Sequence, residues 1–250
     1  MSKICNINEE SLQMAAQIIN EGGVIVVPTD TVYGVACDPF NEAAVAKIYE
    51  LKRRPRTKAL QILMSGVEDL EKLGLYLPSP LDILGKKFLP GGYSPIAHAK
   101  KDSVASNLAT LCKTNETDAQ NDAKTQATEA TQATEATQAT QATQATQATQ
   151  ATEATQGVRV PDCPELMQIL RVTGPLAASS ANRSGNESAD SVEEAFAAFG
   201  NEIPLYLNAG PTRSHVASTV VGADSNDEDG IVILREGVIS ESEIREALRK

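Results

Sequence analysis

The stretch from residue 22 to residue 64 constrains the fold more than any other part of this sequence. An apolar run at 24–27 passes directly into a polar turn at 28–34, and a helix-like segment follows at 41–51. A basic loop at 52–56 and a second apolar run complete the unit. The order strand, polar turn, helix, basic loop, strand is typical of a small-molecule site at the end of a sheet. The basic loop indicates that the small molecule is an anion.

Length, charge and cysteine content set the class of protein. A chain of 250 residues is long enough for one large or two small domains. Its formal net charge of −11 argues against a broad nucleic-acid-binding face, but leaves room for a local cationic pocket. The N-terminus lacks the apolar core of a signal peptide, and no apolar run is long enough to span a bilayer. Four scattered cysteines form no CxxC pair, so we expect no zinc site or disulfide framework and a cytoplasmic location.

Hydrophobic periodicity and capping residues predict one α/β domain of roughly two hundred residues, interrupted by an insertion. Asn8, Asn41, Ser191 and Ser240 are the expected N-caps, the last two in a capping box with a glutamate three residues later. The expected helices lie at 8–20, 41–51, 67–73, 81–88, 165–171 and 191–199, with a last one from 240 to the C-terminus. The expected strands lie at 24–27, 60–64, 94–99, 158–160, 176–180, 204–207, 216–221 and 231–234.

Residues 113–156 form the insertion, in which 127–156 are ten successive Ala-Thr-Gln or Ala-Thr-Glu triplets. A three-residue period matches neither the helix nor the strand period, so the triplets build no consistent apolar face. We expect disorder, because nothing offsets the entropy lost on ordering; a frayed helix and a Thr-rich β-stack are the alternatives. Since a strand at 158–160 resumes the sheet, 1–112 and 157–250 are expected to form a single domain around a disordered Ala-Thr-Gln/Glu loop.

The basic loop carries charges suited to phosphate groups. Lys52 and Arg54 flank Arg53, and Arg56 and Lys58 follow. Arginine gives planar, multi-donor contacts to phosphate oxygens and lysine gives a compact charge. Charge alone favours the competing interpretation, a solvated surface run. The adjacent turn at 28–34 reverses that preference, because it places two hydroxyls and a carboxylate directly after an apolar strand.

Three further positions place polar groups at or within expected strands. Ser179, Ser180 and Asn182 end one strand, Ser218 stands in an otherwise apolar strand, and Arg235 ends the last strand. Each of these positions alone has an ordinary explanation as a turn or strand residue whose polar group bonds the local backbone. Together with the basic loop they predict one site.

Five motifs occur in an order that resembles a known family. They read Pro28-Thr29-Asp30-Thr31-Val32-Tyr33-Gly34, Lys52-x-Arg54-Pro55, Ser180-Ala181-Asn182-x-Ser184-Gly185, Ser218-Thr219-Val220-Val221 and Leu234-Arg235-x-Gly237. The chain is therefore similar to the YrdC family, the L-threonylcarbamoyladenylate synthases, in their single-domain form, over nearly its whole length apart from the insertion. The resemblance implies a twisted mixed β-sheet with flanking helices around a cationic cavity.

The resemblance also implies an activity. Family members condense L-threonine, bicarbonate and ATP to threonylcarbamoyl-AMP and pyrophosphate, and partner proteins transfer the threonylcarbamoyl group to tRNA. Mg²⁺ would arrive with ATP, held by phosphates and water rather than by protein ligands. Carboxylation of an amine and attack on a phosphoanhydride need positioning and charge neutralisation more than a protein nucleophile. The two histidines, His98 and His215, have no recognisable catalytic spacing.

The same resemblance assigns roles to residues. Lys52 and Arg54 would be catalytic, since they would bind the ATP phosphates and stabilise charge on the α-phosphate. The family's Thr-x-Gly-x-Arg strand corresponds to Thr155 and Arg159. The threonine site would consist of Thr31, Tyr33, Arg159, Ser180 and Ser218. The nucleotide site would consist of Lys52, Arg54, Lys58, Thr155, Asn182 and Arg235.

Several positions depart from the family pattern. Gly92 replaces the second proline of a Pro-Gly-Pro motif, Ala59 replaces a usual proline and Leu63 a usual polar residue. Asp190 replaces a small hydroxyl residue near the nucleotide, where an inward-pointing carboxylate would repel phosphate. These departures keep two other hypotheses open: a binding module for double-stranded or transfer RNA, and a diverged paralogue that binds nucleotide without turnover.

Overall fold

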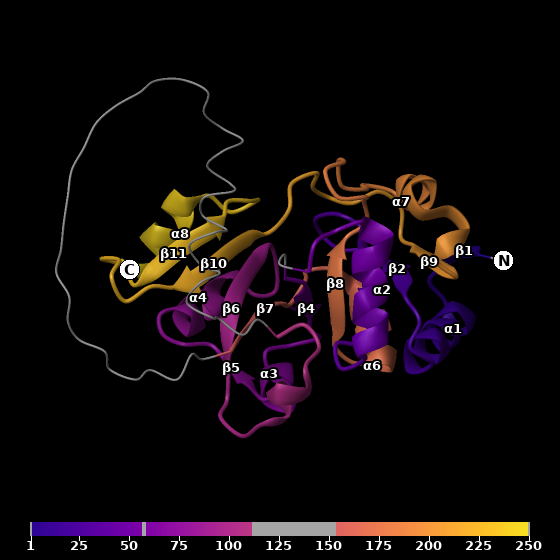
Figure 1. Cartoon of the computed structure of the whole chain (residues 1–250). Coiled ribbons are helices and arrows are strands. Elements are labelled where there is room, and N and C mark those ends of the chain that lie inside the picture. Colours follow the sequence, from indigo (N-terminus) through magenta and orange to yellow (C-terminus); the bar gives the residue numbers. More distant parts are fainter. Residues whose placement is uncertain (1, 57–58, 112–153, 250) are drawn as a thin grey trace, which may run out of the picture.

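The computed structural model describes residues 2–56, 59–111 and 154–249. The strands of this part of the chain form one mixed sheet in the order β1-β9-β2-β3-β8-β4-β7-β6-β10-β11, with β5 paired to β6 (Figure 1). The strands are β1 (Lys3–Asn6), β2 (Ile25–Val27), β3 (Gly34–Cys37), β4 (Gln61–Leu63), β5 (Leu75–Tyr76), β6 (Tyr93–Ala99), β7 (Thr155–Arg159), β8 (Leu176–Ser180), β9 (Leu205–Asn208), β10 (Thr219–Ala223) and β11 (Ile231–Arg235). The helices are α1 (Glu9–Asn20), α2 (Glu42–Lys52), α3 (Asp69–Lys72), α4 (Leu81–Phe88), α6 (Pro164–Thr173), α7 (Val192–Phe199), α8 (Glu241–Leu248) and the 3₁₀ turns η1 (Val104–Asn107) and η2 (Gly200–Glu202). The predicted mixed α/β fold with flanking helices is confirmed.

Local capping signals placed several helices correctly. The Asn8 side chain accepts from the Ser11 amide and begins α1, and the Asn41 side chain accepts from the Ala44 amide and begins α2. Ser240 forms the expected capping box of α8. These helices begin where the sequence predicts because a cap satisfies backbone amides within four residues of itself.

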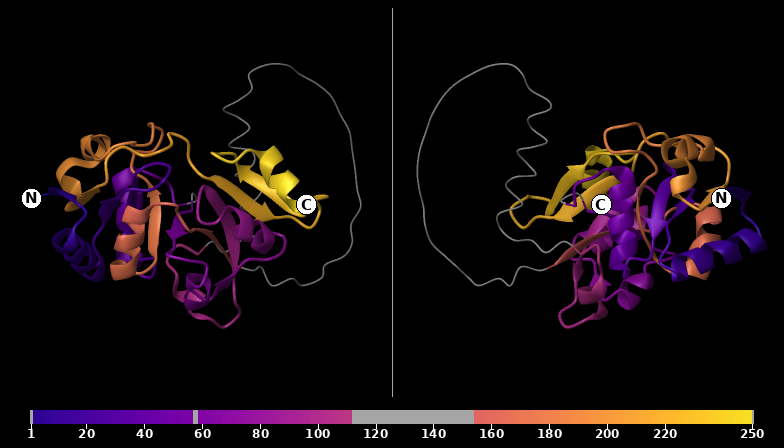
Figure 2. Two further views of the ribbon diagram at one scale, coloured as in Figure 1. Left: turned by 180° about the vertical axis from the view of Figure 1, so that it is seen from behind. Right: turned by 45° about the vertical axis from the view of Figure 1, so that its right-hand side comes forward.

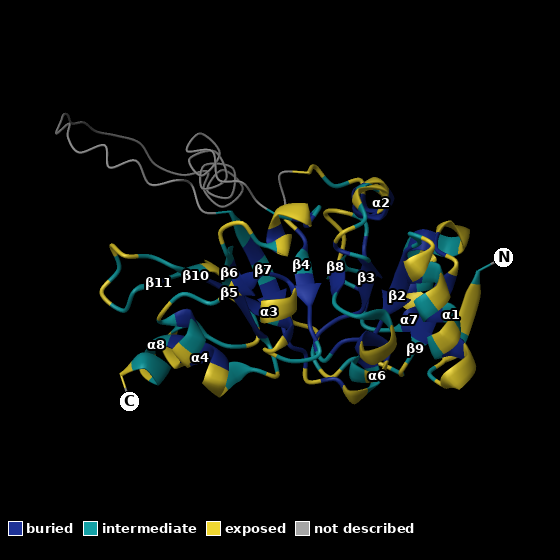
Figure 3. Ribbon diagram, turned by 90° about the horizontal axis from the view of Figure 1, so that it is seen from below, coloured by how far each residue is buried: buried dark blue, intermediate teal, exposed yellow. Residues whose placement is uncertain are grey.

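Helices cover both faces of the half of the sheet that contains β2, β3 and β8. Apolar residues of α2 and α7 pack on one face, and those of α1 and α6 pack on the other. Figure 3 shows α2 and α6 on opposite sides of these strands. A further core joins α4 and α8 to β6, β10 and β11 at the other end of the sheet. The two views of Figure 2 show these two halves of the molecule side by side.

Strand β3 lies within the 22–64 stretch and was not predicted from the sequence. The predicted order ran from polar turn directly to helix, but β3 lies between them and pairs antiparallel with both β2 and β8. Its four residues are too few to show a period, and glycine is the first of them. Residues 28–33 are therefore the loop of a hairpin, which fixes where the polar turn lies.

Other boundaries also differ from the prediction. Strand β1 was not predicted, and β10 begins three residues later than expected, at Thr219. Strand β7 begins at Thr155, so the disorder predicted for 113–156 was wrong for Thr155 and Gln156. The rest of that prediction concerns residues mostly outside the described ranges. No helix among the described residues is long and apolar enough to cross a membrane.

Candidate functional site

Strand β3 brings the two most polar strand ends of the sequence together. Gly34 pairs with Val27 on one side and with Ser180 on the other. A Cβ atom on Gly34 would lie 3.3 Å from the Ser179 carbonyl oxygen, so glycine permits the close approach of β3 and β8. The loop at 28–33 therefore lies beside the turn that begins at Ser180.

The 28–33 loop is held by its own threonines. Thr29 Oγ1 accepts from the backbone amides of Thr31 and Val32 at 3.0 and 3.2 Å, and donates to the Val32 carbonyl at 2.7 Å. Thr29 Oγ1 also lies 3.0 Å from Thr31 Oγ1. Thr29 thus shapes the loop from inside, and Thr31 is left with its hydroxyl toward Arg159, whose Nη1 lies 2.8 Å away.

Arg159 links this loop to the other half of the sheet. Its guanidinium is 1% exposed, and Nη2 forms an ion pair with Asp30 at 2.6 Å. Its Nε donates to the Gly91 carbonyl at 2.8 Å. Burial lowers the pKa of Arg159, while the Asp30 charge opposes that shift. A buried guanidinium with partners on three sides is a fixed positive charge.

Lys52 holds the Ser180–Asn182 turn. The side chain is 1% exposed, and its ammonium donates to the carbonyl oxygens of Ser180 and Asn182 and to Asn182 Oδ1, the last two at 2.7 and 3.1 Å. The Ser180 hydroxyl donates to the same Asn182 Oδ1 at 2.6 Å. Burial and the nearby charge of Arg54 lower the pKa of Lys52 to about 7. The three oxygen acceptors oppose that shift and fix the ammonium against the turn, to which it adds positive charge below about pH 7.

Arg54 and Arg235 approach the same region from different elements. Arg54 donates to the Ser179 hydroxyl at 3.3 Å and to the Ala59 carbonyl at 3.0 Å. Arg235 follows from β11 and donates through Nη2 to the carbonyl oxygen of Ser218 at 2.9 Å and to its hydroxyl at 3.2 Å. These contacts bring the basic loop to the end of β8, and the end of β11 to the start of β10.

Hydrogen bonds place Lys52 and Arg54 at the end of β8 and Arg235 at the start of β10. The pKa of Arg235 is lowered first by desolvation and then by the positive charges of Arg159 and Arg54. The four cations Lys52, Arg54, Arg159 and Arg235, together with the Asp30 carboxylate, carry a net positive charge. We call these five residues the cationic cluster. Like charges held close to one another favour an anion of several charges.

A chain of hydroxyl and amide groups lines the sheet between the cluster's arginines. The Ser94 hydroxyl lies 2.8 Å from Ser218 Oγ and 3.0 Å from Gln61 Oε1. Ser94 and Ser218 are both 1% exposed. Ser218 is predicted from the sequence, but Ser94, Gln61 and the role of Asp30 are not. Ser94 and Gln61 are polar residues in short strands whose side chains alternate between the two faces of the sheet. Until the strand pairing is known, such residues look the same as polar residues that face solvent.

The remaining predicted site residues fall into three groups. Tyr33 is fully buried, and its hydroxyl donates to the Gly210 carbonyl at 2.6 Å and accepts from the Ala209 amide at 3.1 Å, so its polar group is used within the protein. Burial raises the pKa of Tyr33. Thr155 begins β7, where it pairs with His98 of β6. Lys58 lies outside the described residues.

Asp190 does not lie as an isolated charge beside the cluster. Its carboxylate contacts His215 Nδ1, and Thr212 donates its amide to the Asp190 carbonyl at 2.8 Å and its hydroxyl to Oδ1 at 3.5 Å. The acid that replaces the family's hydroxyl residue is therefore engaged by the segment between β9 and β10, which passes between the two halves of the molecule in Figure 1.

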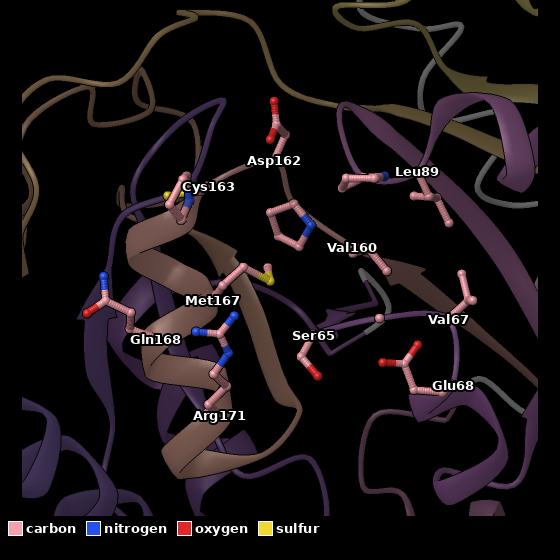
Figure 4. Close-up of a pocket in the computed structure, with 14 residues that line it drawn as sticks. Ser65, Val67, Glu68, Leu89, Val160, Asp162, Cys163, Met167, Gln168 and Arg171 are labelled. Carbon is pink, nitrogen blue, oxygen red and sulfur yellow. The ribbon is translucent and has the colours of Figure 1, made fainter.

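A separate cavity of about 680 Å³ lies between α6 and the residues that follow β4. Figure 4 shows its apolar wall, formed by Leu89, Val160 and Met167, with Glu68 and Arg171 on opposite sides. The Gly91 amide donates to the Val160 carbonyl at 2.8 Å, directly beside the contact of Gly91 with Arg159. The cavity is thus a neighbour of the cationic cluster, but none of its lining residues belongs to that cluster.

Comparisons with known proteins cover most of the chain. The family model Sua5_yciO_yrdC, described as "Telomere recombination", matches residues 17–118 and 107–237. A threonylcarbamoyl-AMP synthase of Bacillus subtilis is 28% identical over 238 residues, which are 95% of this chain and 56% of that protein.

Solved structures share the fold. Pyrococcus abyssi Sua5 complexed with L-threonine is similar with a TM-score of 0.71 and 25% identity, covering 99% of this chain and 60% of that one. Escherichia coli YciO is similar with a TM-score of 0.69 and 21% identity, covering 98% of this chain and 99% of that one. The chain therefore spans little more than half the length of the B. subtilis and P. abyssi proteins and nearly all of YciO.

Proposed function

Since this chain belongs to the Sua5/YciO/YrdC family, we propose that it is an L-threonylcarbamoyladenylate synthase, a nucleotidyltransferase. It would condense L-threonine, bicarbonate and ATP to threonylcarbamoyl-AMP, releasing pyrophosphate. The observation that carries this proposal is the cationic cluster, in which Arg159, Lys52, Arg54 and Arg235 bond the polar residues Thr31, Ser180, Ser179 and Ser218, respectively. A triphosphate is the kind of anion that such a cluster stabilises.

The reaction needs two bonds, and neither needs a nucleophile from the protein. The threonine amine bonds to the carbon of bicarbonate, with loss of water, and a carbamate oxygen then bonds to the α-phosphorus of ATP while pyrophosphate leaves. Negative charge develops on the phosphate oxygens in the second step. We assign Arg54 and Arg235 to those oxygens, with Lys52 contributing its charge from within the Ser180–Asn182 turn.

The threonine half of the site would lie around Thr31 and Arg159. A guanidinium suits the substrate carboxylate, and the hydroxyls of Thr31, Ser180 and Ser218 suit its polar groups. The proposal gains support from the threonylcarbamoyl-AMP synthase name of the B. subtilis relative and from the L-threonine bound to P. abyssi Sua5. Asn182, Thr155 and Lys58 remain proposed nucleotide contacts.

Mg²⁺ fits this proposal as a companion of ATP. Among the described residues, no three His, Cys, Asp or Glu side chains gather as metal ligands. We propose that the ion would be held by phosphate oxygens and water and would supply positive charge to the phosphates. The protein's own residues would act on the phosphates through their arginine N–H groups.

The wider assignments are proposals of the same kind. The product would serve threonylcarbamoyladenosine modification of tRNA in the cytoplasm, through partner proteins that take the threonylcarbamoyl group. Direct tRNA binding would be weak, because the chain carries a formal net charge of −11.

A threonine-dependent pyrophosphate assay tests the proposal. Full-length protein is incubated with ATP, Mg²⁺, bicarbonate and L-threonine, and each substrate is omitted in turn. We expect pyrophosphate release that requires all three substrates and falls strongly in Lys52→Ala and Arg54→Ala. ATP binding without threonine-dependent pyrophosphate would instead identify a paralogue that has kept the fold and lost turnover.

A further inference from the structure

Gln156, the last residue of the triplet repeat, is buried and fully bonded. Its side chain is 1% exposed, although the residue belongs to a sequence that favours solvent. Its Nε2 donates to the carbonyl oxygens of Leu60 and Gly157 at 2.8 and 2.9 Å, and its Oε1 accepts from Thr110 Oγ1 at 2.6 Å. Each of the amide's donors and its oxygen therefore has a partner inside the protein.

These contacts join three segments that are distant in the sequence. Thr110 stands just before the insertion and Gln156 is its last residue, so their bond ties the two ends of the insertion together. The Ala99 amide adds a second tie, because it donates to the Ala154 carbonyl at 2.9 Å. Leu60 follows Ala59, whose carbonyl oxygen accepts from Arg54 of the basic loop at 3.0 Å.

The bond from Gln156 to Leu60 continues the contact between β4 and β7 beyond the end of their backbone pairing. Strands β4 and β7 are parallel, and Ile62 pairs with Val158 as the first pair of the ladder. Leu60, just before β4, and Gln156, in β7, each stand two positions before this pair. Here the Gln156 side-chain amide donates to the Leu60 carbonyl oxygen, where no backbone pair is formed. The end of the basic loop is thereby fixed relative to the start of β7.

Gln156 acts from the back of the sheet. Side chains alternate along a strand, so Thr155, Gly157 and Arg159 share the opposite face. The space at Gly157 borders Gln61 and Ile96, and Arg159 belongs to the cationic cluster. Gln156 can therefore control the front of the sheet only by placing the backbone of β7 and of the basic loop.

We propose that Gln156 is a positioning residue for the nucleotide half of the site: its amide holds Thr155 at the start of β7 and the basic loop that carries Arg54. The inference rests on the proposed function, because the ligand placed there is ATP. Glutamine is required, since a carboxylate at 156 has no N–H for the two carbonyl oxygens and would add a buried negative charge beside them. The preceding triplet ends in Glu153, so a shift of the chain by one triplet would place a glutamate where Gln156 is required.

Three single variants of the full chain test the proposal. Gln156→Glu removes both N–H donors at Leu60 and Gly157. Gln150→Glu makes the same change in the same Ala-Thr-Gln sequence and controls for added charge. Val158→Ala truncates a fully buried residue of the same strand and controls for lost stability, because it leaves the amide in place. ATP and L-threonine affinities are measured separately by calorimetric titration, below the melting temperature of every variant.

We expect Gln156→Glu to lower the melting temperature by on the order of 10 °C and to weaken ATP binding by on the order of tenfold, with threonine affinity changed by less than about twofold. Val158→Ala should lower the melting temperature while ATP affinity stays unchanged, and Gln150→Glu should change neither. Equal losses of ATP affinity in Gln156→Glu and Val158→Ala, or none in either, would overturn the proposal.

Three further results separate the possible failures. If Gln156→Glu does not fold, Gln156→Met serves in its place, because it removes the same N–H donors without adding a charge; unchanged ATP affinity in that folded variant would refute the positioning role. A wild-type protein that binds ATP but makes no adenylate overturns the proposed function and leaves Gln156 tested by affinity. A wild-type protein that binds no ATP overturns both.

Discussion

The ion pair between Asp30 and Arg159 gives the sharpest prediction. Asp30→Asn keeps the shape of the side chain and removes its charge, which leaves the Arg159 guanidinium buried beside a neutral amide. Loss of one partner from a buried pair costs about 3–5 kcal/mol. Arg159 keeps its bonds to Thr31 and Gly91, so we expect the lower end, about 3 kcal/mol.

This free energy corresponds to a fall in melting temperature of roughly 6–12 °C, at about 2–4 °C per kcal/mol for a domain of this size. Asp162→Asn is the matched control, because Asp162 pairs with Arg213 at 3.5 Å with both side chains more than 60% exposed. Such a pair contributes about 0–1 kcal/mol. Thermal unfolding and urea titration of both variants give the comparison.

A double-mutant cycle completes the test. Arg159→Met combined with Asp30→Asn removes both charges, so the double variant should be less destabilised than the sum of the two single variants. If Asp30→Asn is no more destabilising than Asp162→Asn, or if the two single effects simply add, the argument that this pair fixes the 28–33 loop is refuted.

Three other predictions follow from single contacts. The stability of the wild type relative to Lys52→Met should rise by roughly 1 kcal/mol per pH unit from about pH 7 toward 10, because the lowered pKa of Lys52 leaves the unfolded state with more bound protons in that window. Urea titrations of both proteins across this range measure the slope, and a stability difference that does not change with pH would contradict it. Tyr33→Phe should cost about 1–3 kcal/mol by leaving the Gly210 and Ala209 backbone groups without their partner, and an unchanged urea midpoint would contradict it. Deletion of 116–153 should leave the melting temperature within about 3 °C, because closure of the loop depends only weakly on its length; a larger fall would show that the repeat stabilises the fold.

Local signals explain what could be predicted from the sequence. The Asn8 and Asn41 caps act within one turn of helix, and strand β8 was predicted with its observed bounds because its polar end follows a clear apolar run. Lys52 and Arg54 could be singled out because their spacing sits in a dense basic loop. The mixed sheet itself followed from the family resemblance rather than from any periodicity.

Features that depend on partners distant in the sequence could not be predicted. Strand β3 depends on its pairing with β8, more than 140 positions later, and its residues carry no period of their own. Tyr33 is predicted to belong to the threonine site, and nothing in the local sequence indicates that its hydroxyl bonds Gly210. The burial of Gln156 was the least predictable feature. Its sequence is that of the exposed-looking triplet repeat, but its side-chain amide is buried and bonds the sheet.

The central claim is that the cationic cluster joins a carboxylated threonine to AMP. Its most direct test supplies ¹³C-bicarbonate with L-threonine, ATP and Mg²⁺ and determines the mass of the nucleotide product. We predict threonylcarbamoyl-AMP in which one carbon comes from bicarbonate, and its loss in Arg54→Ala. A product without the label, or no adenylate at all from a folded protein that binds ATP, would contradict the claim.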